Sequence, residues 1–163
     1  MEKFQVNIVC KPYVRRFIEL NYGSPAELSK DRDLYAYFRS KLHKKTFKND
    51  KRYSSTLQKY SAEIAIKINR DDFYRYGWDL SATDMIAFNL MLERKTKDFL
   101  YNKVGIQIAF GSSLSESISS FQKKYGFTED VWAKESIYKD CQRNLGINKV
   151  EIREYLSKMM GKL

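Results

Sequence analysis

Two short segments of this chain alternate apolar with polar residues, and the other periodic stretches have helical spacing. The alternation runs from Phe4 to Cys10 and from Glu63 to Ile68, and it predicts two β-strands. Two strands do not make a stable sheet alone, so we expect them to pair with each other, or across the axis of a homodimer, while packed on helices. The pattern predicts an α+β, mainly α-helical protein: a helical bundle with a small two-stranded β element.

Helix starts are predicted where a Ser, Thr or Asn that can cap a helix precedes helical periodicity, at Ser24, Ser81, Ser113, Thr128 and Asn148. The helix after Ser81 keeps roughly heptad apolar spacing from Met85 through Phe88, Leu92 and Phe99 to Ile106, so we expect one long helix that ends before Gly111. Gly126 is expected to end the helix that begins after Ser113.

The chain has 163 residues, 43% of them hydrophobic, which is the size and composition of one globular domain. We therefore predict a single domain over residues 1–163. Within it, residues 44–61 are polar and lack apolar periodicity, which predicts a basic mobile loop or arm. Residues 113–160 are predicted to form a C-terminal helical subdomain.

Positive charge is concentrated in the first part of the chain. Lys and Arg number 30 against 20 Asp and Glu, giving a net charge of +10, and residues 1–60 contribute +8 of it, from 14 basic and 6 acidic side chains. Between Arg39 and Tyr60, eight basic residues face one acid, Asp50. This excess excludes an acidic buffer or activation domain and favours a polyanionic partner, with nucleic acid the first to consider.

Aromatic residues are interleaved with these cations. Ammonium and guanidinium groups neutralise phosphates, and rings can stack on exposed bases. The candidate nucleic-acid contacts of this basic tract are Arg39, Lys41, Lys44, Lys45, Lys48, Lys51, Arg52, Tyr53 and Lys59, with Phe47 and Tyr60 as further rings. The alternative is a solvated basic loop whose aromatics pack back on the body of the protein.

Residues 113–145 read as helix, glycine turn and helix, with Lys124-Tyr125-Gly126-Phe127-Thr128 at the turn. This stretch resembles helix-turn-helix DNA-binding proteins of phage and mobile-element type. The resemblance implies that the second helix of the pair is a recognition helix. The alternative is a core helix pair of a bundle.

A helical wheel gives a separate view of that second helix. It gathers Ala133, Ile137, Tyr138, Cys141 and Leu145 on an apolar face. The opposite face carries the candidate DNA contacts Trp132, Ser136, Lys139 and Arg143. The helix-turn-helix frame would instead bury Trp132, so the two views disagree on this residue, and we favour the wheel.

Catalytic and metal chemistry find little support. His43 is the only histidine, which excludes paired-histidine metal sites, and the seven glycines form no phosphate-binding loop. Cys10 and Cys141 show no metal-type spacing and fit a reducing cytoplasm. Asp84 with Glu93-Arg94-Lys95 superficially matches the acid-x-Lys element of Mg²⁺-dependent nucleases, a minor alternative. We expect no metal, no cofactor and no enzymatic activity.

The leading hypothesis is a non-enzymatic protein that binds duplex DNA, such as a transcriptional regulator or an accessory factor of a phage or mobile element. The alternative is a structural or protein-interaction module, for instance an assembly component of such an element. No apolar run approaches the roughly 20 residues of a membrane span, and the N-terminus lacks a signal peptide. We expect a cytoplasmic protein, or one associated with the nucleoid or a virion.

Overall fold

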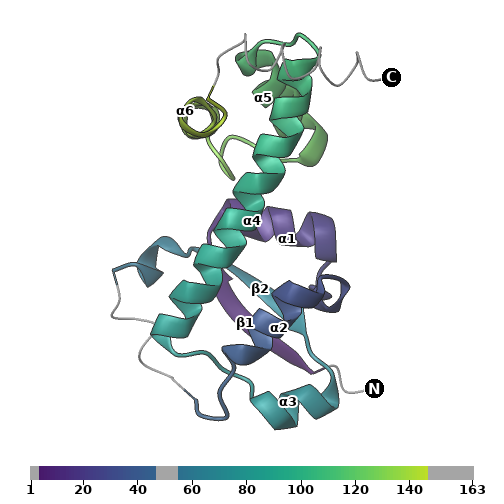
Figure 1. The fold of residues 1–163 in the computed structure, drawn as a ribbon. Coiled ribbons are helices and arrows are strands. Elements are labelled where there is room, and N and C mark those ends of the chain that lie inside the picture. The colour runs from purple at the N-terminus through teal and green to yellow at the C-terminus, as the bar shows by residue number, and fades with distance from the viewer. Residues whose placement is uncertain (1–3, 47–54, 147–163) are drawn as a thin grey trace. The chain divides into compact units, whose positions relative to one another are not determined.

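The computed structural model describes residues 4–46 and 55–146 (Figure 1). These residues form six α-helices and one two-stranded antiparallel sheet, which confirms the mainly helical α+β class. The chain divides into two compact units, residues 1–96 and 97–163, and the boundary falls inside the long helix α4 (Ala82–Ala109). The helix predicted after Asn148 lies outside the described residues.

The sheet pairs β1 (Gln5–Cys10) with β2 (Ala62–Lys67) within one chain. Figure 1 shows the two strands side by side. Val6 lies opposite Ile66 and Ile8 opposite Ile64, and all four side chains are buried. The strand prediction is therefore confirmed to within one residue at each end, because the alternation that marks a strand is the same pattern that buries one of its faces.

Unit 1 surrounds this sheet with α1 (Pro12–Tyr22), α2 (Arg32–Ser40), α3 (Arg70–Tyr76) and the first part of α4. Phe38 of α2 and Phe88 of α4 are fully buried, with ring centroids 5.3 Å apart. The buried Asn89 side chain donates a hydrogen bond to the backbone oxygen of Val9, 2.8 Å away, and so ties α4 to β1.

The helix predicted to begin after Ser24 is wrong. Ala26 instead bridges to β2: its N–H donates to the oxygen of Ala65 at 2.7 Å, and its oxygen accepts from Lys67 N–H at 2.8 Å. A short 3-10 helix, η1 (Leu28–Lys30), follows, and Asp31 caps α2. Backbone hydrogen bonds to the edge of the sheet form here, in place of the helical hydrogen bonds that the local pattern Ser24-Pro25-Ala26-Glu27 favours.

Unit 2 contains the end of α4, α5 (Leu114–Tyr125) and α6 (Lys134–Asn144). The capping box of Ser113 and Glu116 is present as predicted, and Gly126 ends α5 in the left-handed conformation. The rings of Phe121 and Phe127 stack at 4.9 Å in its core, beside the buried Ile137 of α6.

The apolar stripe predicted along α4 is correct only in its first part. Met85, Phe88 and Leu92 are fully buried, whereas Ile106 is 49% exposed. Beyond Thr96 the fully buried residues are Leu100 and Val104. The end of α4 belongs to unit 2, and the side chains of that unit decide which face is buried there.

Gly77 and Gly111 both adopt positive φ, at +117° and +100°, but only Gly77 is crowded. A Cβ at Gly77 would overlap the backbone of His43, whereas a Cβ at Gly111 would meet nothing within 4 Å. Both Gly→Ala variants carry a strain of about 1–3 kcal/mol. We expect Gly77→Ala to lower the free energy of unfolding by clearly more than Gly111→Ala does. Urea unfolding followed by circular dichroism measures both losses, and equal losses would contradict the close approach.

Candidate nucleic-acid interface

The basic tract predicted from the sequence divides in the structure into inward-facing and outward-facing cations. Arg39, Lys41, Lys44, Lys45 and Lys59 can be placed. Lys48, Lys51, Arg52 and Tyr53 lie outside the described residues, as does Phe47.

Arg39 is engaged within unit 1. Its guanidinium lies 3.3 Å from Asp72 and stands over the rings of Tyr35 and Tyr76, at 4.9 and 5.2 Å from their centroids. Asp72, only 8% exposed, also accepts a 2.7 Å hydrogen bond from the hydroxyl of Tyr35. The charge of Arg39 therefore balances a buried carboxylate. This removes Arg39 from the residues that we expect to contact phosphate.

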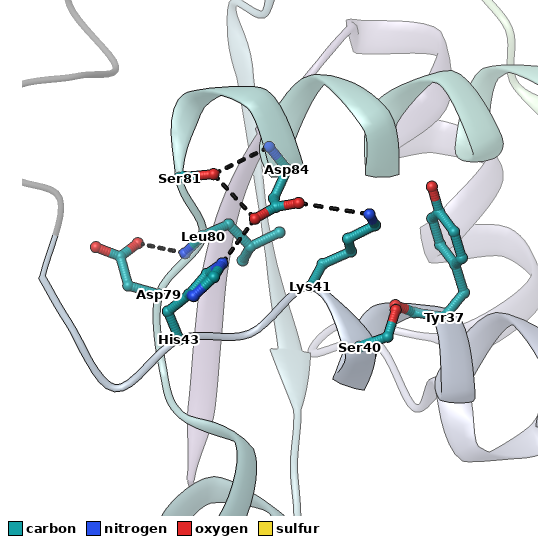
Figure 2. Close-up of polar contacts among 8 residues, drawn as sticks. All are labelled: Tyr37, Ser40, Lys41, His43, Asp79, Leu80, Ser81 and Asp84. Carbon is teal, nitrogen blue, oxygen red and sulfur yellow. Dashed lines mark hydrogen bonds and ion pairs between the residues drawn. The ribbon is translucent and has the colours of Figure 1, made fainter.

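Lys41 is engaged in the same way at the start of α4. Its ammonium lies 3.4 Å from Asp84 and 5.3 Å from the ring centroid of Tyr37. The carboxylate of Asp84 also lies 2.6 Å from His43 Nε2 and accepts a 2.9 Å hydrogen bond from the hydroxyl of Ser81. Figure 2 shows these contacts converging on Asp84. The backbone N–H of Asp84 donates to Ser81 Oγ, so Ser81 caps α4 as predicted.

These contacts set the acidity of Asp84. Partial burial acts to raise its pKa, but hydrogen bonds from His43, Ser81 and Lys41 favour the ionised form more strongly. The pKa of Asp84 therefore lies below its ordinary value of 3.8. The carboxylate stays charged near neutral pH and fixes Lys41 and His43 on unit 1.

Lys44, Lys45 and Lys59 are exposed, and none forms an ion pair with another described residue. The chain on either side of the tract is anchored. His43 bridges to Asp79, and Leu57, in the 3-10 helix η3 (Leu57–Lys59), is buried together with Tyr60. The hypothesis that the ring of Tyr60 is available for a base is wrong, because its residue is only 7% exposed and packs into unit 1.

In unit 2, the structure places Ser136, Lys139 and Arg143 on the exposed side of α6, while Ile137 and Cys141 are buried. Lys139 forms an ion pair at 2.6 Å with Glu135, one turn away on the surface. An exposed pair of this kind is weak and exchanges readily with other charges. Tyr138, predicted on the apolar face, is 36% exposed.

The helical-wheel prediction that Trp132 lies on the exposed face of the second helix is wrong. The helix begins at Lys134 rather than after Thr128, so Trp132 precedes it and does not share its faces. Trp132 is 5% exposed, its ring lies 5.8 Å from that of Phe127, and its backbone oxygen accepts from the Gln122 side chain at 2.9 Å. Turn hydrogen bonds from Val131 and Trp132 to the oxygen of Thr128 direct the ring inward. Trp132 is therefore a core residue.

The carboxylates that suggested a nuclease do not converge. Asp84 and Glu93 are separated on one helix by about 13 Å at 1.5 Å per residue. Glu93 accepts hydrogen bonds from Lys11 and Tyr13, and Lys95 bonds Asp31 at 2.7 Å. Within residues 4–46 and 55–146, no group of three or more His, Cys, Asp or Glu side chains is arranged to hold a metal ion.

In unit 1, the sequence analysis missed two aromatic residues that the structure describes as exposed. Tyr74 of α3 is 55% exposed, and Trp78, which follows Gly77, is 37% exposed. The sequence carried no signal for them, because an aromatic beside a helix end is equally compatible with a core position.

Comparisons with family models, with curated proteins and with solved structures found no match for this chain. In the part of the chain that the structure describes, no helix combines the length and apolar character that a membrane span requires. Cys10 and Cys141 are buried free thiols whose pKa burial raises to about 12, so neither is a ready nucleophile.

The lowered pKa of Asp84 makes stability depend on pH. The stabilisation from its ionised form is fully present above the ordinary pKa of 3.8 and is lost as pH falls through the lowered folded-state value. Asp84→Asn should therefore lower the melting temperature near neutral pH. The difference from the unchanged protein should shrink as the pH falls into strong acid. Asp71→Asn, at an exposed first-turn carboxylate of α3, is the matched control. Melting curves from neutral pH to strong acid test this, and parallel pH profiles for both variants would contradict it.

Proposed function

We propose that this protein is a non-enzymatic DNA-binding protein, a regulator or accessory factor of a phage or mobile element. The observation that carries the proposal is that Lys44, Lys45 and Lys59 are each exposed and form no ion pair with a described carboxylate, on a chain of net charge +10. The nearby Arg39 and Lys41 are neutralised by Asp72 and Asp84, so the uncompensated charge belongs to the outward-facing lysines.

Phosphate attraction follows from this arrangement. A lysine without a protein partner releases counterions from DNA when it binds, and this release supplies sequence-independent affinity. Lys48, Lys51 and Arg52 lie between Lys45 and Lys59 in the sequence and add three further charges to the same tract. The chain on either side of the tract is anchored in unit 1, by the bridge between His43 and Asp79 and by the burial of Tyr60.

The exposed face of α6 is the second element of the proposal. Ser136, Lys139 and Arg143 lie at helical spacing and combine two cations with a small hydroxyl, which suits the approach of a helix to a groove of duplex DNA. We propose that this face orients the protein on duplex DNA and contacts base edges through Arg143.

A salt titration tests the phosphate contacts. Replacing Lys44 and Lys45 by Ala should reduce the slope of log affinity against log salt by about 2, since each phosphate contact contributes about 0.9. Lys30→Ala with Lys67→Ala is the control of equal charge, because both of these lysines pair with Glu27. Fluorescence anisotropy with a labelled duplex at several ionic strengths gives the slopes, and identical slopes for the two double variants would refute the assignment.

Selection from a random duplex library tests the α6 face. Arg143→Ala should reduce the preference for the selected sequence over others by about five-fold to a hundred-fold, as expected for loss of a base contact. Lys124→Ala, which removes an exposed cation of α5, is the control. Any loss of affinity in this variant should be the same for all sequences. If the preference of Arg143→Ala is unchanged, α6 does not read bases.

One observation favours a second candidate function, a protein-interaction module. Phe110 is 84% exposed and Ile106, one helical turn before it near the end of α4, is 49% exposed. Adjacent exposed apolar side chains that form a patch mark protein contacts in other chains. Light scattering combined with a gel shift on random duplex separates the candidates. A stable oligomer that ignores DNA favours the interaction module.

A further inference from the structure

We propose that unit 1 binds an unpaired nucleotide of single-stranded DNA, with the base stacked on Trp78 and Tyr74 and the adjoining phosphates held by Lys44 and Lys45. This inference rests on the proposed function and adds to it: the lysines of unit 1 contact the phosphates of either form of DNA, and the rings bind a base that no partner strand covers.

The aromatic surface is built from four rings. Phe73 stacks on Trp78 with centroids 5.6 Å apart and 29° between the planes, and it meets Tyr74 edge-on at 5.5 Å. Phe4 contacts both Phe73, at 4.9 Å, and Tyr74, at 5.7 Å. Phe4 and Phe73 are half-buried, whereas Tyr74 and Trp78 are exposed. The two outer rings are therefore supported by inner rings and lose little freedom when a ligand stacks on them.

The lysines begin beside this surface. The backbone N–H of Trp78 donates to the oxygen of His43 at 3.0 Å, and His43 N–H donates to the oxygen of Asp79 at 2.8 Å. Gly77 is packed against the His43–Lys44 peptide so closely that no side chain fits between them. The backbone at Lys44 therefore lies next to Gly77 and Trp78, and Lys45 follows it, although Lys45 and Trp78 are 33 positions apart in the sequence.

The charges around the rings favour an anion. Lys44 and Lys45 are exposed, and so are Arg70 and Arg75 on the helix α3 that carries Tyr74. Two carboxylates oppose them: Asp71 is exposed, and Asp79 is half-buried and accepts the N–H of Leu80 at 2.9 Å. Among the described residues, Asp72 and Asp84 are already paired with Arg39 and Lys41, so four cations face two acids beside the two exposed rings. Positive charge beside exposed rings is the combination that binds single-stranded nucleic acid.

The choice of an unpaired base follows from geometry. In a duplex both faces of an internal base are covered by its stacked neighbours, so a protein ring cannot reach them without disrupting the helix. In a single strand each base offers a free face, and stacking is tolerant of base identity. Phosphate contacts alone would bind either form, so the two exposed rings are the feature that distinguishes the forms.

The two tryptophans allow a direct test. Trp132 is buried in unit 2, so quenching of the fluorescence by a ligand in unit 1 reports on Trp78. The protein is titrated with a thymidine oligonucleotide, an abasic oligonucleotide of equal length and a duplex, while anisotropy of the labelled DNA gives each affinity. We expect quenching by the single strand and roughly ten-fold tighter binding of it than of the abasic strand.

Variants separate stacking from folding. Trp78→Ala should weaken single-strand binding by about ten-fold or more and leave duplex affinity unchanged. Trp78→Phe keeps a ring, so it should retain most of the affinity while losing the quenching. Phe110→Ala removes an exposed ring of unit 2 and should change neither quantity. Circular dichroism establishes that each variant is folded.

The possible failures are distinguishable. If the protein binds duplex DNA but the single strand neither quenches Trp78 nor depends on it, this inference is overturned and the proposed function stands. If neither form of DNA binds at low salt, both are overturned. Equal affinity for the thymidine and abasic strands would also overturn the stacking, because phosphate contacts would then account for all binding.

Discussion

The backbone pairing of His43 with Asp79, made possible by the absence of a side chain at Gly77, is the contact on which the candidate interface depends. It holds the segment that follows α2 against the segment between α3 and α4. The side chain of His43 reaches the Asp84 carboxylate from the same position (Figure 2). Without this backbone pairing, the chain at Lys44 and Lys45 would not be held beside Trp78.

Carboxylates within unit 1 decide which cations remain available to a ligand. Asp72 forms an ion pair with Arg39, and Asp84 contacts both Lys41 and His43. A count of positive charges along the sequence treats all of these residues alike, yet a cation paired with a carboxylate of its own fold adds little net charge for a ligand. The outward charge begins at Lys44, the first cation after Arg39 and Lys41 that pairs with no described carboxylate.

Several local patterns predicted the fold correctly because they are satisfied by neighbours in sequence. The capping residues Ser81 and Ser113 bond N–H groups three residues ahead, and the alternation of β1 depends on one buried face. Ser24 and Thr128 carry similar local signals, but no α-helix begins there. After Ser24, backbone hydrogen bonds between Ala26 and β2 form instead of the expected helix. After Thr128, the chain forms a turn in which Trp132 packs on Phe127.

The amino-acid sequence by itself determined the mainly helical class, the two strands, the helix starts at Ser81 and Ser113 and the excess of positive charge, since each depends on composition or on contacts within a few residues. Only the tertiary structure decided that Trp132 is internal, that Arg39 and Lys41 are neutralised, and that Trp78 and Tyr74 are exposed beside Lys44. These properties depend on contacts between segments far apart in the chain, and periodicity within one segment carries no information about what packs against it.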